Sequence, residues 1–404
     1  MPRQVRAPVL VSYAAFVLVG VSAAVSGVLL PAQMASYGVD RATIGITFFT
    51  SSAGFVLAGI STGALIGRYG MRIALATGGG AYVLAGLYLA SRPPFPAFVA
   101  AQLITGYGTG VLESALNVCL AALPGATALL NRLHAFFGVG ALLGPVLAAW
   151  IISVASWSVV WLVLAVACVP LVAGFLLAYP GREPAVVAPG QAVPLSEPAV
   201  PVPEPPAPAP RRMLTTALRD PGVQLGAVML ALYVGLEISV GNWAFSYLTQ
   251  ARALPATLAG YTISGYWLGL TLGRFLISPI ATRAGATAAA MIYACLAGVT
   301  AAATLAWLSP GALACVALGL LGFCLGPIFP TTMAITPQLT QARLVPTAIG
   351  VLNAASVIGG SALPWLAGAI TQNAGMMVLL PFAIALALAQ LAVWRPIAGR
   401  LDRA

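Results

Sequence analysis

Residues 106–145, GYGTGVLESALNVCLAALPGATALLNRLHAFFGVGALLGP, predict two membrane helices joined by a short turn at Pro124-Gly125. In a chain of which only 6% of residues are charged, this apolar stretch holds four polar side chains: Glu113, Asn117, Asn131 and His134. An ionisable group inside hydrocarbon is costly, so its presence there indicates a functional site by default. The alternative for each of these side chains is a hydrogen bond to a neighbouring helix.

The composition of the whole chain is that of a membrane protein. Of its 404 residues, 60% are hydrophobic, and the mean hydropathy of +0.99 is outside the range of soluble domains. A spanning helix needs about 20 apolar residues. The chain offers twelve such runs, at residues 9–33, 43–67, 72–91, 95–122, 130–153, 157–179, 222–249, 256–281, 285–308, 310–337, 345–371 and 375–395. We therefore expect an all-α membrane protein with twelve transmembrane helices.

The arginines predict the orientation of these helices. All 18 basic residues are arginine. With the N-terminus inside, 14 of them fall on inner segments, and Arg274 lies within a helix. The outer loops hold only three: Arg41, Arg92 and Arg252. Because positive residues accumulate on the cytoplasmic side, we expect a multi-pass protein of the inner (plasma) membrane with both termini in the cytoplasm.

Several other functional classes do not fit the sequence. The net charge of +10 comes without a basic cluster interleaved with aromatic residues, so no nucleic acid partner is expected. The five cysteines lie inside apolar runs and lack metal-ligand spacing, so they are interpreted as packing residues and no metal site is expected. No P-loop, dinucleotide-binding glycine pattern or nucleophile elbow is present, so an enzyme is not expected.

One connection is exceptionally long and divides the predicted helices six to six. Eleven of the residues in 180–210 are proline, a composition that favours an extended linker. We accordingly expect an N-terminal six-helix bundle (1–179), a Pro-rich cytoplasmic linker (180–219) and a C-terminal six-helix bundle (220–404).

The two halves also repeat one another in sequence. At a nearly constant offset of 215 to 219 residues, matching positions include Gly20 with Gly235, Gly45 with Gly260, Gly70 with Gly285, Gly106 with Gly322 and Gly140 with Gly359. Two halves of like orientation, related by pseudo-two-fold symmetry around a midplane site, form a transporter architecture.

Residues 63–72, GALIGRYGMR, lie between the second and third predicted helices. They resemble the G-x-x-x-D-R-x-G-R-R loop of the major facilitator superfamily at Arg68, Gly70 and Arg72, with Gly67 at the Asp position. A weaker match to the same motif occurs at Arg283 in the second half. The resemblance implies a gating loop that holds the cytoplasmic side closed, and the alternative is that these arginines only set the topology.

Two glutamates inside predicted helices are candidates for proton coupling. Glu113 and Asn117 are four residues apart and share a helix face. Glu237 lies in the middle of the run 222–249, where Gly235 and Gly241 permit a bend or a break of the helix. A carboxylic acid in a low-dielectric site can take up and release a proton near neutral pH, which suits proton coupling.

His134, the only histidine, lies three residues after Asn131. It could relay a proton or act as a neutral hydrogen-bond donor near the cytoplasmic surface.

Other polar and aromatic residues are candidate ligands for a polar solute. Arg274 stays charged at any depth, so its expected partner is Glu237, Glu113 or an anionic substrate. Trp267 could stack on the apolar face of a sugar, or it could pack against lipid or protein. The substrate-binding candidates are Asn117, Asn131, Asn242, Trp243, Tyr266, Trp267, Arg274 and Asn353.

The whole chain resembles the major facilitator superfamily, and within it the fucose:proton symporter family. The stretches that carry this resemblance are NRLHAFFGVGALLGP (131–145), YVGLEISVGNW (233–243), GYWLGLTLGR (265–274) and IGVLNAASVIGGSALPWLAG (349–368). The resemblance implies that Glu113 occupies the place of that family's coupling glutamate. The family's aspartate in the first helix has no counterpart here, since the run holds only Ser22, Ser26 and Gln33, and its asparagine in the fifth helix falls at about Phe137.

Together these observations predict a secondary active transporter. We expect it to take up a small polar solute, above all a sugar, by proton-coupled symport with alternating access, and to place Glu113 and Glu237 on a shared cavity. Protons are the expected coupling ion, with no other cofactor, and the lipid bilayer is the expected partner of a monomer. Two alternatives remain open: a proton-driven exporter of drugs or metabolites, and a membrane receptor or scaffold that binds a solute without moving it.

Overall fold

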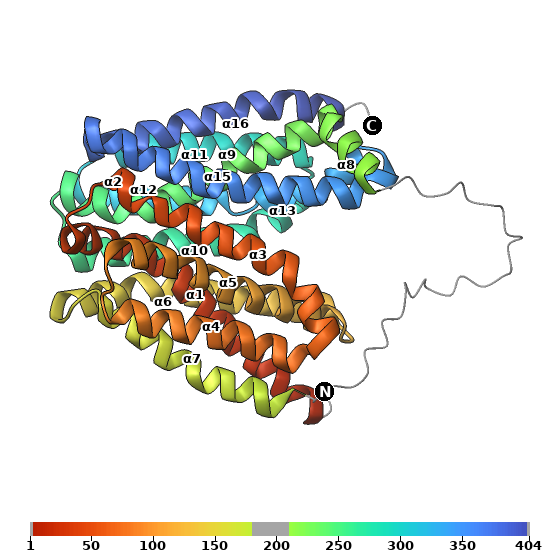
Figure 1. Ribbon diagram of the computed structural model, residues 1–404. Coiled ribbons are helices and arrows are strands. Elements are labelled where there is room, and N and C mark those ends of the chain that lie inside the picture. Colours follow the sequence, from red (N-terminus) through yellow and green to blue (C-terminus); the bar gives the residue numbers. More distant parts are fainter. Residues whose placement is uncertain (1–2, 180–209, 402–404) are drawn as a thin grey trace, which may run out of the picture.

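The computed structural model describes residues 3–179 and 210–401, and every regular element within them is helical (Figure 1). An N-terminal group contains α1 (Arg3–Tyr37), α2 (Arg41–Ile44), α3 (Ile46–Tyr69), α4 (Met71–Ala90), α5 (Phe95–Ala121), α6 (Ala126–Val154) and α7 (Ser158–Ala178). A C-terminal group contains α9 (Pro221–Ser246), α10 (Ala256–Arg283), α11 (Ala288–Leu308), α12 (Gly311–Leu325), α13 (Ile328–Ala334), α14 (Thr336–Leu339), α15 (Val345–Ala374) and α16 (Leu379–Leu401). The prediction of an all-helical fold is confirmed.

The predicted linker lies outside the described residues up to residue 209. Its last ten residues form a helix, α8 (Pro210–Arg219). Asp220 then begins α9, because its carboxylate accepts hydrogen bonds from the backbone N–H groups of Gly222 and Val223.

Eleven of the described helical segments are long and apolar enough to cross a membrane. The remaining predicted span, 256–281, corresponds to α10, which has 28 residues and is therefore long enough. Its hydropathy is lowered by polar residues that include Thr262, Thr271 and Arg274. The predicted helix count therefore holds, with α10 as a span whose polar side chains need neighbouring helices.

Glycines bring helices of each group into direct backbone contact. In the N-terminal group, a Cβ on Gly20 would collide with the carbonyl of Phe137 on α6, and one on Gly140 would collide with the carbonyl of Val17 on α1. Such close approach is typical of membrane helices, which associate through packing because lipid offers no hydrophobic drive.

The C-terminal group repeats this contact between α9 and α15. A Cβ on Gly235 would collide with the side chain of Leu363, and one on Gly359 would collide with the carbonyl of Ala231. Gly235 and Gly359 are the sequence counterparts of Gly20 and Gly140. The repeat found in the sequence is therefore a repeat of helix-pair contacts.

A second pair of helices repeats in the same way. Gly106 on α5 meets the carbonyl of Ser51 on α3, and its counterpart Gly322 on α12 meets the carbonyl of Tyr266 on α10. The turns repeat as well: Gly70 and Gly285 have φ angles of +83° and +70°, a region that favours glycine.

One span in which the sequence permits a break is continuous, and another span, which contains two prolines, is interrupted. A break of α9 at Gly235 and Gly241 does not occur, because the helix is continuous there, and these glycines instead admit Leu363 and the ring of Trp267. The region of the two prolines in the tenth predicted span does break: α12 ends at Leu325 and α13 begins at Ile328, on either side of Pro327.

The start of α1 and the end of α16 lie at one end of the molecule, here called the terminal end, and α2 lies at the other, here called the closed end (Figure 1). Between described residues, every side-chain hydrogen bond that joins the two groups is at the closed end. Asp40 accepts from Gln372 at 2.8 Å, and Gln372 accepts from the backbone N–H of Ala42 at 3.1 Å. Trp365 donates to the carbonyl of Ala42 at 3.1 Å.

Arg41 also joins the two groups at this end, through two hydrogen bonds of its side chain. Its guanidinium donates to the carbonyl of Thr371 at 2.9 Å and to Gln250 Oε1 at 2.8 Å. The other two arginines of this end serve their own groups: Arg92 donates to Ser158, and Arg252 to Tyr247 and to the carbonyls of Ala306 and Trp307.

The acid of the closed end stays ionised across the physiological range. Hydrogen bonds from Thr43 and Gln372 hold the pKa of Asp40 below its ordinary value of 3.8. A lowered pKa means that its contribution to closure is complete above pH 3.8 and is lost only as the pH falls through the lowered pKa.

Replacing Gly140 with Ala is expected to lower the melting temperature of the detergent-purified protein, because overpacking typically costs ~1–3 kcal/mol. Gly359→Ala is expected to act in the same direction in the other group. Gly80→Ala is the control, since a Cβ there would meet nothing within 4 Å. Equal melting temperatures for all three variants would refute the role of these helix contacts.

Breaking the closed end is expected to separate the groups there. With spin labels on Ser36 and Met377 in a cysteine-free background, the double variant Arg41→Ala/Gln372→Ala should add a longer distance to the distribution measured by pulsed EPR. The unsubstituted protein should keep its distribution between pH 5 and 8, about the range over which Asp40 stays ionised. Gln224→Ala, at the terminal end, is the control, and an unchanged distribution in the double variant would contradict the gate.

Candidate functional site

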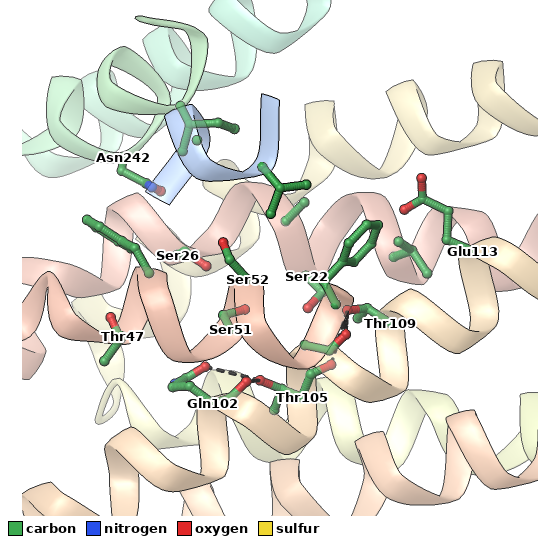
Figure 2. Close-up of a pocket in the computed structure, with 18 of the residues that line it drawn as sticks. Ser22, Ser26, Thr47, Ser51, Ser52, Gln102, Thr105, Thr109, Glu113 and Asn242 are labelled. Carbon is green, nitrogen blue, oxygen red and sulfur yellow. Dashed lines mark hydrogen bonds between the residues drawn. The ribbon is translucent and has the colours of Figure 1, made fainter. Parts of the chain in front are cut away.

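A cavity of about 460 Å³ lies between the two groups of helices (Figure 2). Small-molecule sites typically have volumes of ~300–1,000 Å³. Its wall is built from α1, α3, α5, α6 and α7 on one side and from α9, α10 and α15 on the other. A solute held here would contact both groups.

A stripe of polar side chains on α5 forms one side of the cavity (Figure 2). Gln102, Thr105, Thr109 and Glu113 follow one another at intervals of three and four residues, which places them on one helix face. Thr105 donates to Gln102 Oε1 at 3.1 Å, and Thr109 donates to the carbonyl of Thr105 at 3.1 Å. Glu113 ends the stripe toward the terminal end.

Helices α1 and α3 add short hydroxyl side chains to the same wall. Ser22, Ser26, Ser51 and Ser52 line the cavity, and Figure 2 shows them between the stripe on α5 and Asn242. Ser22 accepts a hydrogen bond from the buried Tyr82 of α4 at 2.8 Å. Because its oxygen is occupied in this way, its own O–H is available to a solute.

The C-terminal group contributes a more apolar wall. Its lining residues are Val234, Ile238, Asn242, Trp267, Val357 and Gly360. Asn242 and the indole N–H of Trp267 are their polar groups. Rings line the cavity from several elements, including Phe48, Phe55, Phe137 and Trp161.

Glu113 is the one ionisable side chain among the cavity-lining residues that the structure describes. It makes no hydrogen bond or ion pair with another described residue. Arg274 is close enough to act on it electrostatically across the gap between the groups, but Arg274 itself does not line the cavity. The wall therefore carries one acid and no cation.

Glu237 belongs to a separate cluster behind the cavity wall. Its carboxylate pairs with Arg274 at 3.5 Å, with the two side chains 9% and 37% exposed. Tyr266 donates to its backbone carbonyl at 2.9 Å. The expectation that Glu113 and Glu237 share one cavity is thus wrong: Glu237 faces α10, where an arginine is available, and only Glu113 reaches the cavity.

The other residues predicted for the site fall into two sets. Asn242 and Trp267 line the cavity. Trp243 is fully buried and donates to the carbonyl of Pro364 at 2.8 Å, so with Tyr266 it joins helices of the C-terminal group and does not face a solute. Asn117 donates to the carbonyl of Glu113 on its own helix at 2.8 Å.

Three further predicted residues lie away from the cavity wall. Asn131 and Asn353 are exposed side chains outside the lining. His134 is exposed too, and its ring packs edge-on against Phe16 with centroids 5.6 Å apart. It lies near enough to Arg274 for the two charges to interact.

The arginines of the predicted gating loop make no ion pair with a described residue. Arg68 lies over the ring of Tyr69 at 5.3 Å, and Arg72 and Arg283 lie at the terminal end with it. In this conformation the side-chain hydrogen bonds between the groups are at the opposite end. The arginines of this loop do not join the two groups by ion pairs with described residues.

Sequence reasoning missed several polar residues of the cavity. Gln102, Thr47, Ser51 and Ser52 were not predicted for the site, although all line it. Its spacing from Glu113 could have identified Gln102 as a cavity residue. Gln102 precedes Glu113 by eleven residues, or about three helical turns, and therefore lies on the same helix face.

A sequence profile described as Major Facilitator Superfamily matches residues 12–362. The chain belongs to the major facilitator superfamily. It is accordingly a multi-pass membrane transporter and not an enzyme.

Comparisons with individual proteins agree with this assignment. The chain is 26% identical to Bypass of stop codon protein 6 of Saccharomyces cerevisiae over 90% of its own length and 77% of that protein. It is 22% identical to a glucose/mannose transporter of Bacillus subtilis, over 90% and 88% of the two chains. Among solved structures, a D-xylose-proton symporter superposes with a TM-score of 0.73 at 14% identity, over 97% and 98% of the two chains.

Removing one member of the buried ion pair is expected to destabilise this transporter. Arg274→Met leaves the buried carboxylate of Glu237 without its cation, at a typical cost of ~1–3 kcal/mol. The double variant Glu237→Gln/Arg274→Met should recover most of the lost melting temperature, because it removes both charges. Arg343→Met, at an exposed arginine, is the control. A single variant that melts like the unsubstituted protein would show that the pair contributes nothing.

Proposed function

We propose that this transporter moves a small neutral polar solute of the sugar class together with protons, by alternating access. The observation that carries the proposal is the position of Glu113, an acid without a described partner on a hydroxyl-rich cavity wall between the two groups. A carboxylate in such a place is costly unless it is protonated or paired. Protonation removes the only charge from the wall, so the state of Glu113 can decide which conformation is favoured.

The chemistry of the cavity supports a neutral solute. Serine, threonine and carboxamide groups both donate and accept hydrogen bonds, as sugar hydroxyls do. Aromatic rings such as Phe137 and Trp267 offer flat apolar surfaces for the faces of a sugar ring. The similarity to a glucose/mannose transporter of B. subtilis supports the same substrate class.

The contacts between the groups support alternating access. One end of the cavity is closed by hydrogen bonds from Asp40, Arg41 and Trp365. Comparable bonds between the groups are not found at the terminal end among the described residues. In alternating access, a barrier at the terminal end has to form before the barrier at the closed end opens.

We further propose that the protein is a monomer in the inner (plasma) membrane with the terminal end in the cytoplasm. The described arginines support this orientation, since Arg41, Arg92 and Arg252 alone lie at the closed end. Positive residues favour the cytoplasmic side. The structure is then the inward-facing state.

Glu113→Gln is expected to abolish accumulation of solute driven by a pH gradient while sparing exchange. In proteoliposomes loaded with an alkaline buffer, the unsubstituted protein should accumulate radiolabelled D-glucose or D-mannose, and the variant should only equilibrate it. The reason is that glutamine keeps the hydrogen-bonding shape but cannot carry a proton. Glu237→Gln is the comparison, expected to lower stability but to keep the response to the gradient.

The alternatives give different results in the same vesicles. Symport acidifies the lumen that accumulates solute, whereas an exporter that exchanges solute for protons changes the lumenal pH in the opposite sense. A receptor or scaffold binds solute but moves none. Normal accumulation by Glu113→Gln would exclude this residue as the coupling acid.

A further inference from the structure

Three carboxamide side chains line the cavity from three different helices. They are Gln33 on α1, Gln102 on α5 and Asn242 on α9, and they are 4%, 8% and 9% exposed. Two belong to the N-terminal group and one to the C-terminal group. Figure 2 shows Gln102 and Asn242 on opposite sides of the serines of α1 and α3.

These carboxamides have hydrogen-bonding groups to spare. Gln102 Oε1 accepts from Thr105, which leaves its NH₂ group free. Gln33 and Asn242 make no side-chain hydrogen bond with another described residue. These amide groups line the cavity and are not sealed from it, so they are available to hydrogen-bond a partner from outside the chain.

Several carboxamides elsewhere in the described chain are paired within the protein. Asn117, Asn373 and Gln390 each donate to a carbonyl of their own helix, and Gln372 bridges to Asp40. At the cavity wall the amide groups of Gln33 and Asn242 have no described partner, and the buried indole N–H groups of Trp161 and Trp267, which also line the cavity, have none either.

We propose that Gln33, Gln102 and Asn242 form a carboxamide cradle that binds adjacent hydroxyl groups of a neutral sugar. This inference rests on the proposed function and adds the residues that select the substrate. Each carboxamide offers a donor and an acceptor side by side, which matches a pair of neighbouring hydroxyls. A sugar acid is rejected, because Glu113 is the only charged group on the wall and no cation balances a second carboxylate.

The placement of Asn242 ties this recognition to the closed end. Gly27 of α1 packs so closely on α9 that an added Cβ would lie 2.7 Å from the Cα of Asn242. Asn242 is therefore held at the contact between the two groups. A sugar bound to Asn242 and to Gln102 bridges the groups beside that contact.

The test is binding by the purified full-length protein, measured by thermal shift and by tryptophan fluorescence. The probes are D-glucose, D-mannose, D-galactose and L-fucose, the 2-, 3- and 6-deoxy forms of the sugar that binds, and D-glucuronate. The variants are Gln33→Met, Gln102→Met and Asn242→Leu, which keep volume and remove the amide. Asn373→Leu is the control, a carboxamide at the closed end that faces away from the cavity.

Each cradle variant is expected to weaken binding of the sugar by ~10-fold or more, because a site built around a hydroxyl loses its partner. For each variant one deoxy sugar should bind the variant and the unsubstituted protein equally, since the hydroxyl that the amide contacts is already missing. That pairing separates a direct contact from a general loss of folding. D-glucuronate should bind no form of the protein.

Two results would overturn the inference, and they differ in what else they overturn. If the unsubstituted protein binds and accumulates a neutral sugar and the three variants bind it equally well, the cradle is refuted and the proposed function stands. If none of the neutral sugars binds and glucuronate does, both are refuted.

Discussion

The structure depends on the contact of glycine with the backbone of a neighbouring helix. A membrane offers little hydrophobic drive for helices to associate, so close packing must supply it. Gly20 and Gly140 let the backbones of α1 and α6 touch, Gly359 does the same for α15 and α9, and Gly235 makes room for the side chain of Leu363. These two pairs, together with the pairs α3–α5 and α10–α12, make each half a packed body. The cavity then lies where the two bodies meet and where polar side chains need not be sealed inside either one.

Polar chemistry is distributed unevenly over this symmetric frame. The N-terminal group supplies nearly all the hydroxyls of the cavity and its one acid, Glu113. The C-terminal group keeps its own charges apart, as the pair of Glu237 and Arg274. The frame is duplicated because packing constrains both halves alike. The cavity wall is not duplicated, because helix packing does not constrain which side chains face the cavity.

The fold could be predicted from the sequence because apolar length and the positions of arginine are local properties. The run 256–281 corresponds closely to α10 (Ala256–Arg283), for example. The site was harder, because neighbouring helical residues point about 100° apart and only the surrounding helices decide which one faces the cavity. Asn242 lines it whereas Trp243 is fully buried against Pro364. Glu237 resembled Glu113 in sequence, but the arginine one helix away determines its role.

The polarity of α10 has a consequence for how the chain enters the membrane. Each of the other spans is long and apolar enough to cross a membrane, but α10 is not among those segments. Its polar side chains become acceptable only once neighbours such as α9 and α12 surround them, as the pairing of Arg274 with Glu237 illustrates. We therefore expect α10 to become stable in the membrane only together with its neighbouring helices, so that the C-terminal half depends on assembly as a group.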